Sequence, residues 1–202
     1  MKKILGLLLL AFALPAFAAT PAPDEVVRQV TDEVMKAVQQ SEALKAGQRE
    51  AVMALLEQKV LPHVDFRLAT RLALGRDWRK ATPEQRDRLV DAFKTMLLRI
   101  YTSSIGSYRG QKMEVERVKA PPSADDVTVR NRYISPGRPP VSVDYAMRLT
   151  PQGWKIYDVI VEGASLVLTY RTEFAQVVRE SGIDGLIARL AEKNQPDQPA
   201  RR

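Results

Sequence analysis

The sequence predicts an α+β fold in which helices flank a curved four-stranded antiparallel sheet. In the first half of the chain, apolar residues recur at three- and four-residue steps, which is typical of helices that bury one face. From Met113 to Val161 the pattern changes to short runs rich in β-branched and aromatic residues, separated by turns that contain proline and glycine. Helical spacing returns at Leu166. Helices, then a meander of strands, then helices make an α+β domain.

The first 18 residues have the order of a secretory signal peptide. Lys2 and Lys3 precede an apolar run from Ile4 to Leu14, and Ala16 to Ala18 supplies small residues for cleavage. The run is shorter than the roughly 20 apolar residues of a membrane-spanning helix, although an uncleaved N-terminal anchor is the alternative. We expect cleavage after Ala18 and export of a soluble protein.

The composition limits the chemistry and the partners. The 202 residues include no cysteine, so neither thiol chemistry nor disulfides are available. Removing Lys2 and Lys3 lowers the formal charge from +7 to +5, that is, 7 minus 2. Moderate basicity suits anionic surfaces such as phospholipid headgroups, and export makes nucleic acid an unexpected partner. We expect a single domain over residues 19–193 and a disordered polar tail over 194–202.

Helix boundaries are marked by capping residues. Thr82 is placed as an N-cap, Pro83 as the first helical residue and Gln85 as the partner of Thr82 in a capping box. Gly182 is expected to separate the last two helices. The expected helical segments are 24–40, 48–61, 65–74, 83 to 106 or 110, 166–181 and 183–192.

The strand-like runs are 113–119, 127–134, 141–149 and 154–161. Their short connections favour an antiparallel meander. The third run alternates cleanly, with Val143 and Tyr145 between Ser142 and Asp144, so it has one apolar and one mostly polar face. A single sheet covered by helices on its apolar face can enclose a pocket between the two layers.

Candidate catalytic residues are few. His63, the only histidine, follows Pro62 at a helix junction and is expected to be structural rather than a base or metal ligand. Ser165 lacks the second glycine of a nucleophile motif and suits an N-cap. Asp158 lies in an apolar strand. It is either the raised-pKa base of a small isomerase-like enzyme, or a structural carboxylate that accepts hydrogen bonds from a helix start or from Arg171. We expect no catalytic residue, no metal and no cofactor.

Three segments carry a resemblance to a known family. Residues 73–85 read ALGRDWRKATPEQ, and residues 137–145 read GRPPVSVDY. Residues 154–166 read WKIYDVIVEGASL and are followed by GIDGLI at 182–187. In this order they resemble the periplasmic phospholipid-binding proteins of the Mla pathway, the toluene-tolerance auxiliary family.

The resemblance implies an NTF2-like fold, in which a curved sheet wrapped by helices encloses the acyl chains of a phospholipid. It implies a periplasmic carrier, and not an enzyme, that helps to maintain the lipid asymmetry of the outer membrane. Its expected partners are an inner-membrane ABC transporter complex with an MCE-domain component and an outer-membrane lipoprotein–porin complex. We expect a monomer whose bound ligand is phospholipid.

Strand and helix patterning supplies the candidate lipid-lining residues, with an ordinary dry core as the alternative for each. They are Phe93, Leu97, Tyr101, Val129, Tyr133, Val143, Tyr145, Met147, Ile156, Val159 and Val161.

The residues before the helix start at Pro83 carry a candidate docking patch. Arg76, Arg79 and Lys80 lie beside Trp78. They could meet the partner complexes through charge, or form an ordinary solvated loop.

Overall fold

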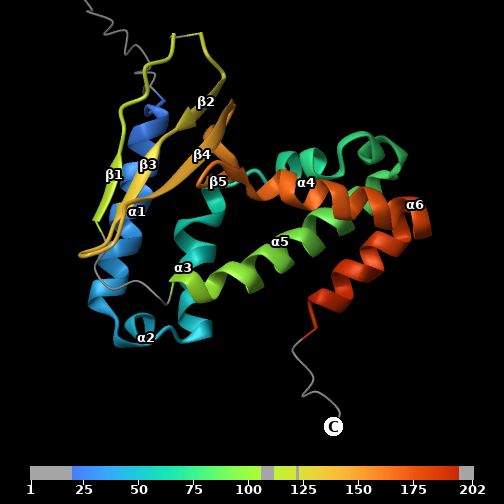
Figure 1. Cartoon of the computed structure of the whole chain (residues 1–202), viewed down its shortest axis with the longest axis horizontal. Helices are drawn as coiled ribbons and strands as arrows, with labels where there is room; N and C mark the ends of the chain where they lie inside the picture. Colours follow the sequence, from blue (N-terminus) through green and yellow to red (C-terminus); the bar gives the residue numbers. More distant parts are fainter. Residues whose placement is uncertain (1–19, 106–111, 122, 196–202) are drawn as a thin grey trace, which may run out of the picture.

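The computed structural model describes residues 20–105, 112–121 and 123–195 (Figure 1). The predicted signal peptide, residues 1–18, lies outside these ranges. None of the helices within them is long and apolar enough to cross a membrane. The helices are α1 Pro23–Gln40, α2 Glu42–Lys45, α3 Arg49–Lys59, α4 Phe66–Leu74, α5 Pro83–Ile105 and α6 Leu166–Lys193, with the 3₁₀ turns η1 Leu61–His63 and η2 Gly75–Lys80.

The sequence signals for helix ends are confirmed at two positions. The Thr82 backbone N–H donates to Gln85 Oε1 at 3.0 Å, and the Gln85 N–H donates to Thr82 Oγ1 at 3.2 Å, which completes the predicted capping box. Gly182 adopts a φ of 71° and breaks α6 into two halves. Helix α6 ends at Lys193 with Asn194 as its C-cap, and the side-chain amide of Asn194 donates to the Ala92 carbonyl of α5 at 2.9 Å.

Within the described ranges the sheet has six antiparallel strands, where four were predicted. They are β1 Lys112–Val115, β2 Asp126–Val129, β3 Asn131–Ile134, β4 Val141–Thr150, β5 Gly153–Val161 and β6 Ala164–Ser165. Their order is β1-β3-β4-β5-β6, with β2 also paired to β4. The additional strand β6 forms because positive φ angles at Glu162 and Gly163 turn the chain back onto β5.

The second predicted strand is divided at Arg130 into β2 and β3. The two parts keep one register along β4, with Val129 opposite Tyr145 and Arg132 opposite Ser142. Between them, the Asn131 backbone N–H donates to the Asp144 carboxylate at 3.1 Å. The Asp144 side chain therefore accepts a hydrogen bond from an N–H that would bond to a backbone carbonyl in an uninterrupted strand pair.

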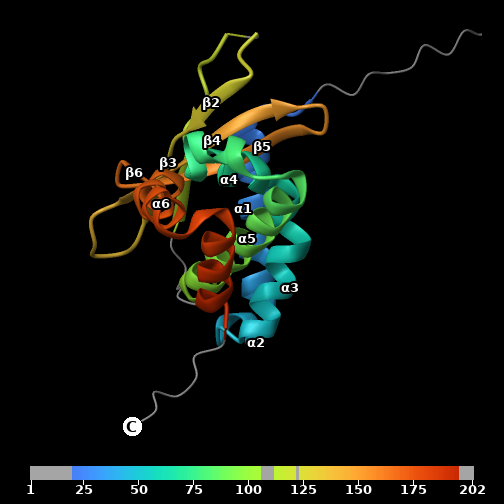
Figure 2. The same cartoon turned by 90° about the vertical axis from the view of Figure 1, so that its right-hand side faces the viewer.

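The buried apolar residues form three clusters instead of one continuous core. The helical cluster joins α4, η2, α5 and α6; the sheet cluster packs α1 onto β2, β4 and β5; the amino-terminal cluster joins α1, α2 and α3. Figures 1 and 2 show the sheet and α1 at one end of the molecule and the α4–α6 pair at the other, with α5 reaching from α3 to α6. The sheet with α1 and the α4–α6 helices therefore have separate apolar clusters, and the apolar surfaces between these clusters are the place to look for a ligand.

Candidate functional site

One face of the sheet collects the apolar side chains of several strands. Tyr145 of β4 lies opposite Val129 of β2 and Val159 of β5, and Val143 lies opposite Val161. Directly opposite residues on neighbouring strands point to the same face. The register therefore brings these five predicted lining residues together.

An irregularity in β5 extends this face. Ile156 and Val159 are three residues apart, so regular alternation would place them on opposite faces. The register shifts between Ala146 and Met147, which sets Met147 opposite Ile156 while Tyr145 stays opposite Val159. The extra residue of this bulge is Tyr157, and the bulge returns Ile156 to the apolar face.

The face divides into a filled part and a partly open part. Val129 and Met147 are each 0% exposed and pack with Val26 and Val27 of α1 in the sheet cluster. The other six predicted residues of the sheet are half-buried: Tyr133, Val143, Tyr145, Ile156, Val159 and Val161. Tyr145 and Ile156 pack against the sheet cluster that includes α1, and the part of the face beyond this cluster is incompletely packed.

The predicted residues of α5 lie elsewhere. Phe93 is 0% exposed and makes edge-to-face contacts with Tyr170 and Phe174 of α6, at 5.2 Å between each pair of ring centroids. Leu97 packs against the same helical cluster. Tyr101 lies in α5, but its side chain is outside the described residues. The structure does not bring Phe93 into the cluster that holds Val129 and Met147, and a lining role for α5 stays a prediction.

Polar groups interrupt the apolar face at one place. The hydroxyl oxygens of Tyr133 and Tyr145 are 3.2 Å apart. Burial raises the pKa of both phenols, well above the usual value for Tyr145. Asn131 lies between Val129 and Tyr133 in the same two-residue phase, and it is 1% exposed. The sequence analysis did not single out Asn131, although strand alternation places residues 129, 131 and 133 on one face.

Asp158 has a structural role. Its Oδ1 accepts the Val167 backbone N–H at 3.0 Å, and its Oδ2 accepts the Ser165 hydroxyl. Ser165 Oγ accepts the Leu168 N–H at 2.9 Å, as expected of an N-cap for α6. Both carboxylate oxygens are therefore occupied in holding the start of α6 to β5.

His63 is half-buried in η1 and belongs to no described metal site. Its pKa is lowered mainly by burial and further by the charge of Lys155. No group of three or more His, Cys, Asp or Glu side chains that could hold a metal lies within the part of the chain that the structure describes.

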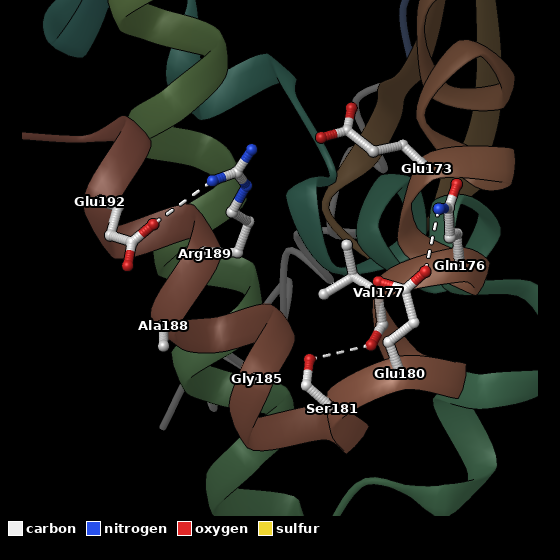
Figure 3. A pocket seen from close by; sticks show the side chains of 9 residues that line it. All are labelled: Glu173, Gln176, Val177, Glu180, Ser181, Gly185, Ala188, Arg189 and Glu192. Atoms are coloured by element: carbon white, nitrogen blue, oxygen red, sulfur yellow. Dashed lines mark hydrogen bonds and ion pairs between the residues drawn. The ribbon is translucent and has the colours of Figure 1, made fainter.

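The two halves of α6 enclose a polar groove of about 530 Å³ (Figure 3). Two of its carboxylates are in ion pairs, Glu173 with Lys193 at 2.5 Å and Glu192 with Arg189 at 3.5 Å, and the third, Glu180, accepts a hydrogen bond from Gln176 at 2.9 Å. Charged walls of this kind do not suit acyl chains. The lining residues are Glu173, Gln176, Val177, Glu180, Ser181, Gly185, Ala188, Arg189 and Glu192.

The candidate docking patch is only partly available. Lys80 is paired with Asp77 at 2.6 Å, whereas Arg76 and Arg79 are exposed and form no ion pair with any described residue. Trp78 is buried, and guanidinium groups lie 5.6 and 5.4 Å from its ring, those of Arg67 and Arg86 respectively. All three basic residues are exposed, and Arg76 and Arg79 are the two that have no ion-pair partner among the described residues.

Comparison with protein-family models identifies a family. The model of the MlaC protein family matches residues 28–192, which is most of the chain. The matched range includes the sheet, the helical cluster and α1 from Arg28 onward.

Individual relatives agree with the family match. A toluene tolerance protein, ttg2D, of Pseudomonas putida is 28% identical over 207 residues, covering 94% of this chain and 92% of that protein. The intermembrane phospholipid transport system binding protein MlaC of Haemophilus influenzae is 22% identical, covering 90% and 89%. A phospholipid-binding protein from Ralstonia solanacearum, solved in complex with a phospholipid, superimposes with a TM-score of 0.80 at 34% identity, covering 86% of this chain and 97% of that one.

Proposed function

Since the chain belongs to the MlaC family, we propose that it is a phospholipid carrier of an intermembrane phospholipid transport system. The observation that carries this proposal is the half-buried apolar face of the sheet, formed by Tyr133, Val143, Tyr145, Ile156, Val159 and Val161. The similar Ralstonia solanacearum protein, which was solved with a bound phospholipid, supports it.

The physical task of such a carrier needs apolar walls and no catalytic group. Burying one CH₂ is worth about 0.8 kcal/mol, so two acyl chains with roughly thirty CH₂ groups carry a gross cost on the order of 24 kcal/mol in water. A protein that encloses the chains removes this cost during transfer. Walls that are apolar, with few polar contacts, suffice for that purpose.

The acyl chains are proposed to lie between the sheet face and the helices, in a pocket of the NTF2-like kind. Two features support this position: the apolar residues form three separate clusters, and the face beyond α1 is incompletely packed. Leu97 and Tyr101 of α5 are proposed as part of the opposite wall. Phe93, Val129 and Met147 would support the walls from behind, since each is fully buried.

The setting is proposed to be the periplasm, after removal of residues 1–18. A monomer would exchange lipid between an inner-membrane MCE-domain transporter complex and an outer-membrane lipoprotein–porin complex, and so contribute to outer-membrane lipid asymmetry. The N-terminal sequence order and the names of the relatives support this setting.

The isomerase-like alternative has no observation in its favour. It requires an Asp158 carboxylate free to take a proton from a substrate, but both oxygens accept hydrogen bonds from the start of α6. The family of the chain is one of lipid carriers.

The ligand itself provides the test. Protein purified from the periplasm of a Gram-negative host without detergent is analysed by native mass spectrometry and lipid extraction. We expect a non-covalent adduct with the mass of a diacyl phospholipid, near one per chain. Protein that carries no lipid and binds none from added phospholipid vesicles would overturn the proposal.

A further inference from the structure

The paired tyrosines, with Asn131 beside them, are the polar features of a mostly apolar face. Tyr145 lies opposite Val129 and Val159, and Tyr133 lies opposite Met113 and Val141. Both side chains are half-buried, and their hydroxyl oxygens are 3.2 Å apart. The pair therefore lies on the surface that is proposed to hold the lipid.

The two hydroxyls together carry one more donor hydrogen than the contact between them requires. Each phenol carries one O–H, and the contact between the two oxygens consumes a single donor. Neither hydroxyl bonds to any other described group. Asn131 does not accept this second hydrogen. Its Oδ1 accepts no hydrogen bond within the described ranges, and its Nδ2 donates to the Val129 carbonyl at 2.9 Å. One phenolic O–H thus remains free to donate beside the apolar face.

This free O–H stays protonated at neutral pH, and leaving it without a hydrogen-bond partner raises the free energy of the folded protein. Burial favours the neutral form of both phenols, so the hydrogens stay in place at neutral pH. A polar group that loses water without gaining a partner is destabilising, whereas a ligand acceptor placed against it recovers the loss. A phospholipid has such acceptors next to its acyl chains, namely the carbonyl oxygens of its two ester groups.

We propose that the Tyr133–Tyr145 pair donates its free O–H to an ester carbonyl oxygen of the bound phospholipid. The inference rests on the proposed carrier function and deepens it. The contact fixes how far the acyl chains enter the protein, because it holds the junction between chains and glycerol at one point of the sheet. It also makes the site selective for ester-linked over ether-linked lipid.

The test compares two lipids that differ only in this group. Delipidated protein is titrated with a diester phospholipid and with the diether phospholipid of identical chains and headgroup. Wild-type protein is expected to bind the diester roughly three- to tenfold more tightly, as one net hydrogen bond would give. The double variant Tyr133→Phe/Tyr145→Phe is expected to bind both lipids equally. Each single variant keeps one O–H that no longer has a phenol partner, so at least one of the two is expected to retain a preference for the diester.

Tyr157→Phe is the matched control. Tyr157 loses a phenol hydroxyl that is already paired with Asp126 at 2.8 Å, so its diester-to-diether ratio should equal that of wild type. Circular dichroism verifies the fold of each variant. Should the double variant fail to fold, the wild-type ratio still decides.

Two results would overturn this inference alone: equal affinity of wild-type protein for both lipids, or an undiminished preference in the folded double variant. Equal weakening of both lipids in the double variant would also overturn it, because it would indicate a phosphate contact or altered packing. Failure of wild-type protein to bind either lipid would overturn the carrier function and this inference together.

Discussion

At the scale of single residues, Asp158 is a candidate catalytic base in the sequence and a helix-capping carboxylate in the structure. A carboxylate among apolar strand residues resembles a catalytic base until its partners are known. Here it accepts the Val167 N–H and the Ser165 hydroxyl, which are groups at the start of a helix. Helix starts leave N–H groups without internal partners, and a carboxylate is a favourable acceptor for them.

Asp158→Asn is therefore expected to act on stability. One carboxylate oxygen becomes an NH₂ group that faces a donor, which should lower the free energy of unfolding by about 1–3 kcal/mol. Urea denaturation measures this, with the exposed Asp184→Asn on α6 as the control expected to stay within about 0.5 kcal/mol of wild type. An Asp158→Asn protein as stable as wild type would refute the capping role.

The buried tyrosines predict a loss of stability at high pH. Burial raises the pKa of Tyr133 and Tyr145, and burial together with Asp126 raises that of Tyr157 to about 12. In the unfolded chain phenols ionise near pH 10. Above that pH the unfolded state binds fewer protons than the folded state, so stability falls as pH rises and is unaffected below it.

Denaturation at several pH values tests this expectation. The decline between about pH 10 and 12 should be shallower in Tyr133→Phe/Tyr145→Phe than in wild type, since two of the contributing groups are gone. Superimposable pH profiles for the two proteins would contradict the assignment.

At the scale of the elements, Gly75 controls how α4 leads into η2. Its φ of +59° and ψ of −123° lie in a region open only to glycine. A Cβ there would lie 2.8 Å from Arg171 Nη2, but the end of an arginine side chain can move away. Backbone strain is therefore the larger part of the cost.

Gly75→Ala is expected to destabilise the fold by about 1–3 kcal/mol. Adding Arg171→Ala should not restore stability, because it relieves the clash and leaves the backbone strain. Thermal and urea denaturation of the single and double variants provide the comparison. Full recovery in the double variant would show that the clash, and not the backbone, sets the cost.

Much of the element order was predictable, because its signals are local. The start of α5 was predicted from Thr82, Pro83 and Gln85, and the break in α6 was predicted from Gly182. Helix α2 was not predicted, although Ser41 caps it by accepting the Leu44 N–H at 3.3 Å, because a four-residue helix has almost no periodicity. The split at Arg130 depends on Asp144, which is distant in sequence, and no local pattern reveals it.

The candidate site was predictable strand by strand but not as a whole. Alternation identified the apolar face of Val143 and Tyr145, because the period of a strand fixes which residues share a face. Periodicity also identified the stripe of Phe93 and Leu97 on α5, but a stripe does not say which element packs against it. Phe93 packs against Tyr170 and Phe174 of α6, a choice made by tertiary packing.

At the scale of the whole molecule, a carrier must meet partners without losing its ligand. Arg76 and Arg79 are exposed and form no ion pair with a described residue, and they lie on η2, outside the sheet. Reversing both charges, Arg76→Glu/Arg79→Glu, should slow association with a reconstituted inner-membrane MCE-domain complex at low salt. Bound phospholipid should be unchanged, because encounter rates depend on surface charge whereas retention depends on apolar contact.

Surface plasmon resonance at two salt concentrations measures the association rate. The control Lys36→Glu/Arg49→Glu makes the same change in net charge on α1 and α3, at exposed positions. If the two double variants associate at the same rate, the patch has no specific part in docking.

The lipid content of Val143→Arg tests the central claim most directly. Val143 is half-buried on the apolar face, opposite Val161, and a long arginine there would occupy space proposed for acyl chains while its head reaches towards the surface. Thr128→Arg, exposed on the opposite face of the sheet, is the control. Native mass spectrometry after detergent-free purification should find Val143→Arg folded but without lipid, and Thr128→Arg loaded like wild type. A folded Val143→Arg protein that still carries a full complement of phospholipid would contradict the account.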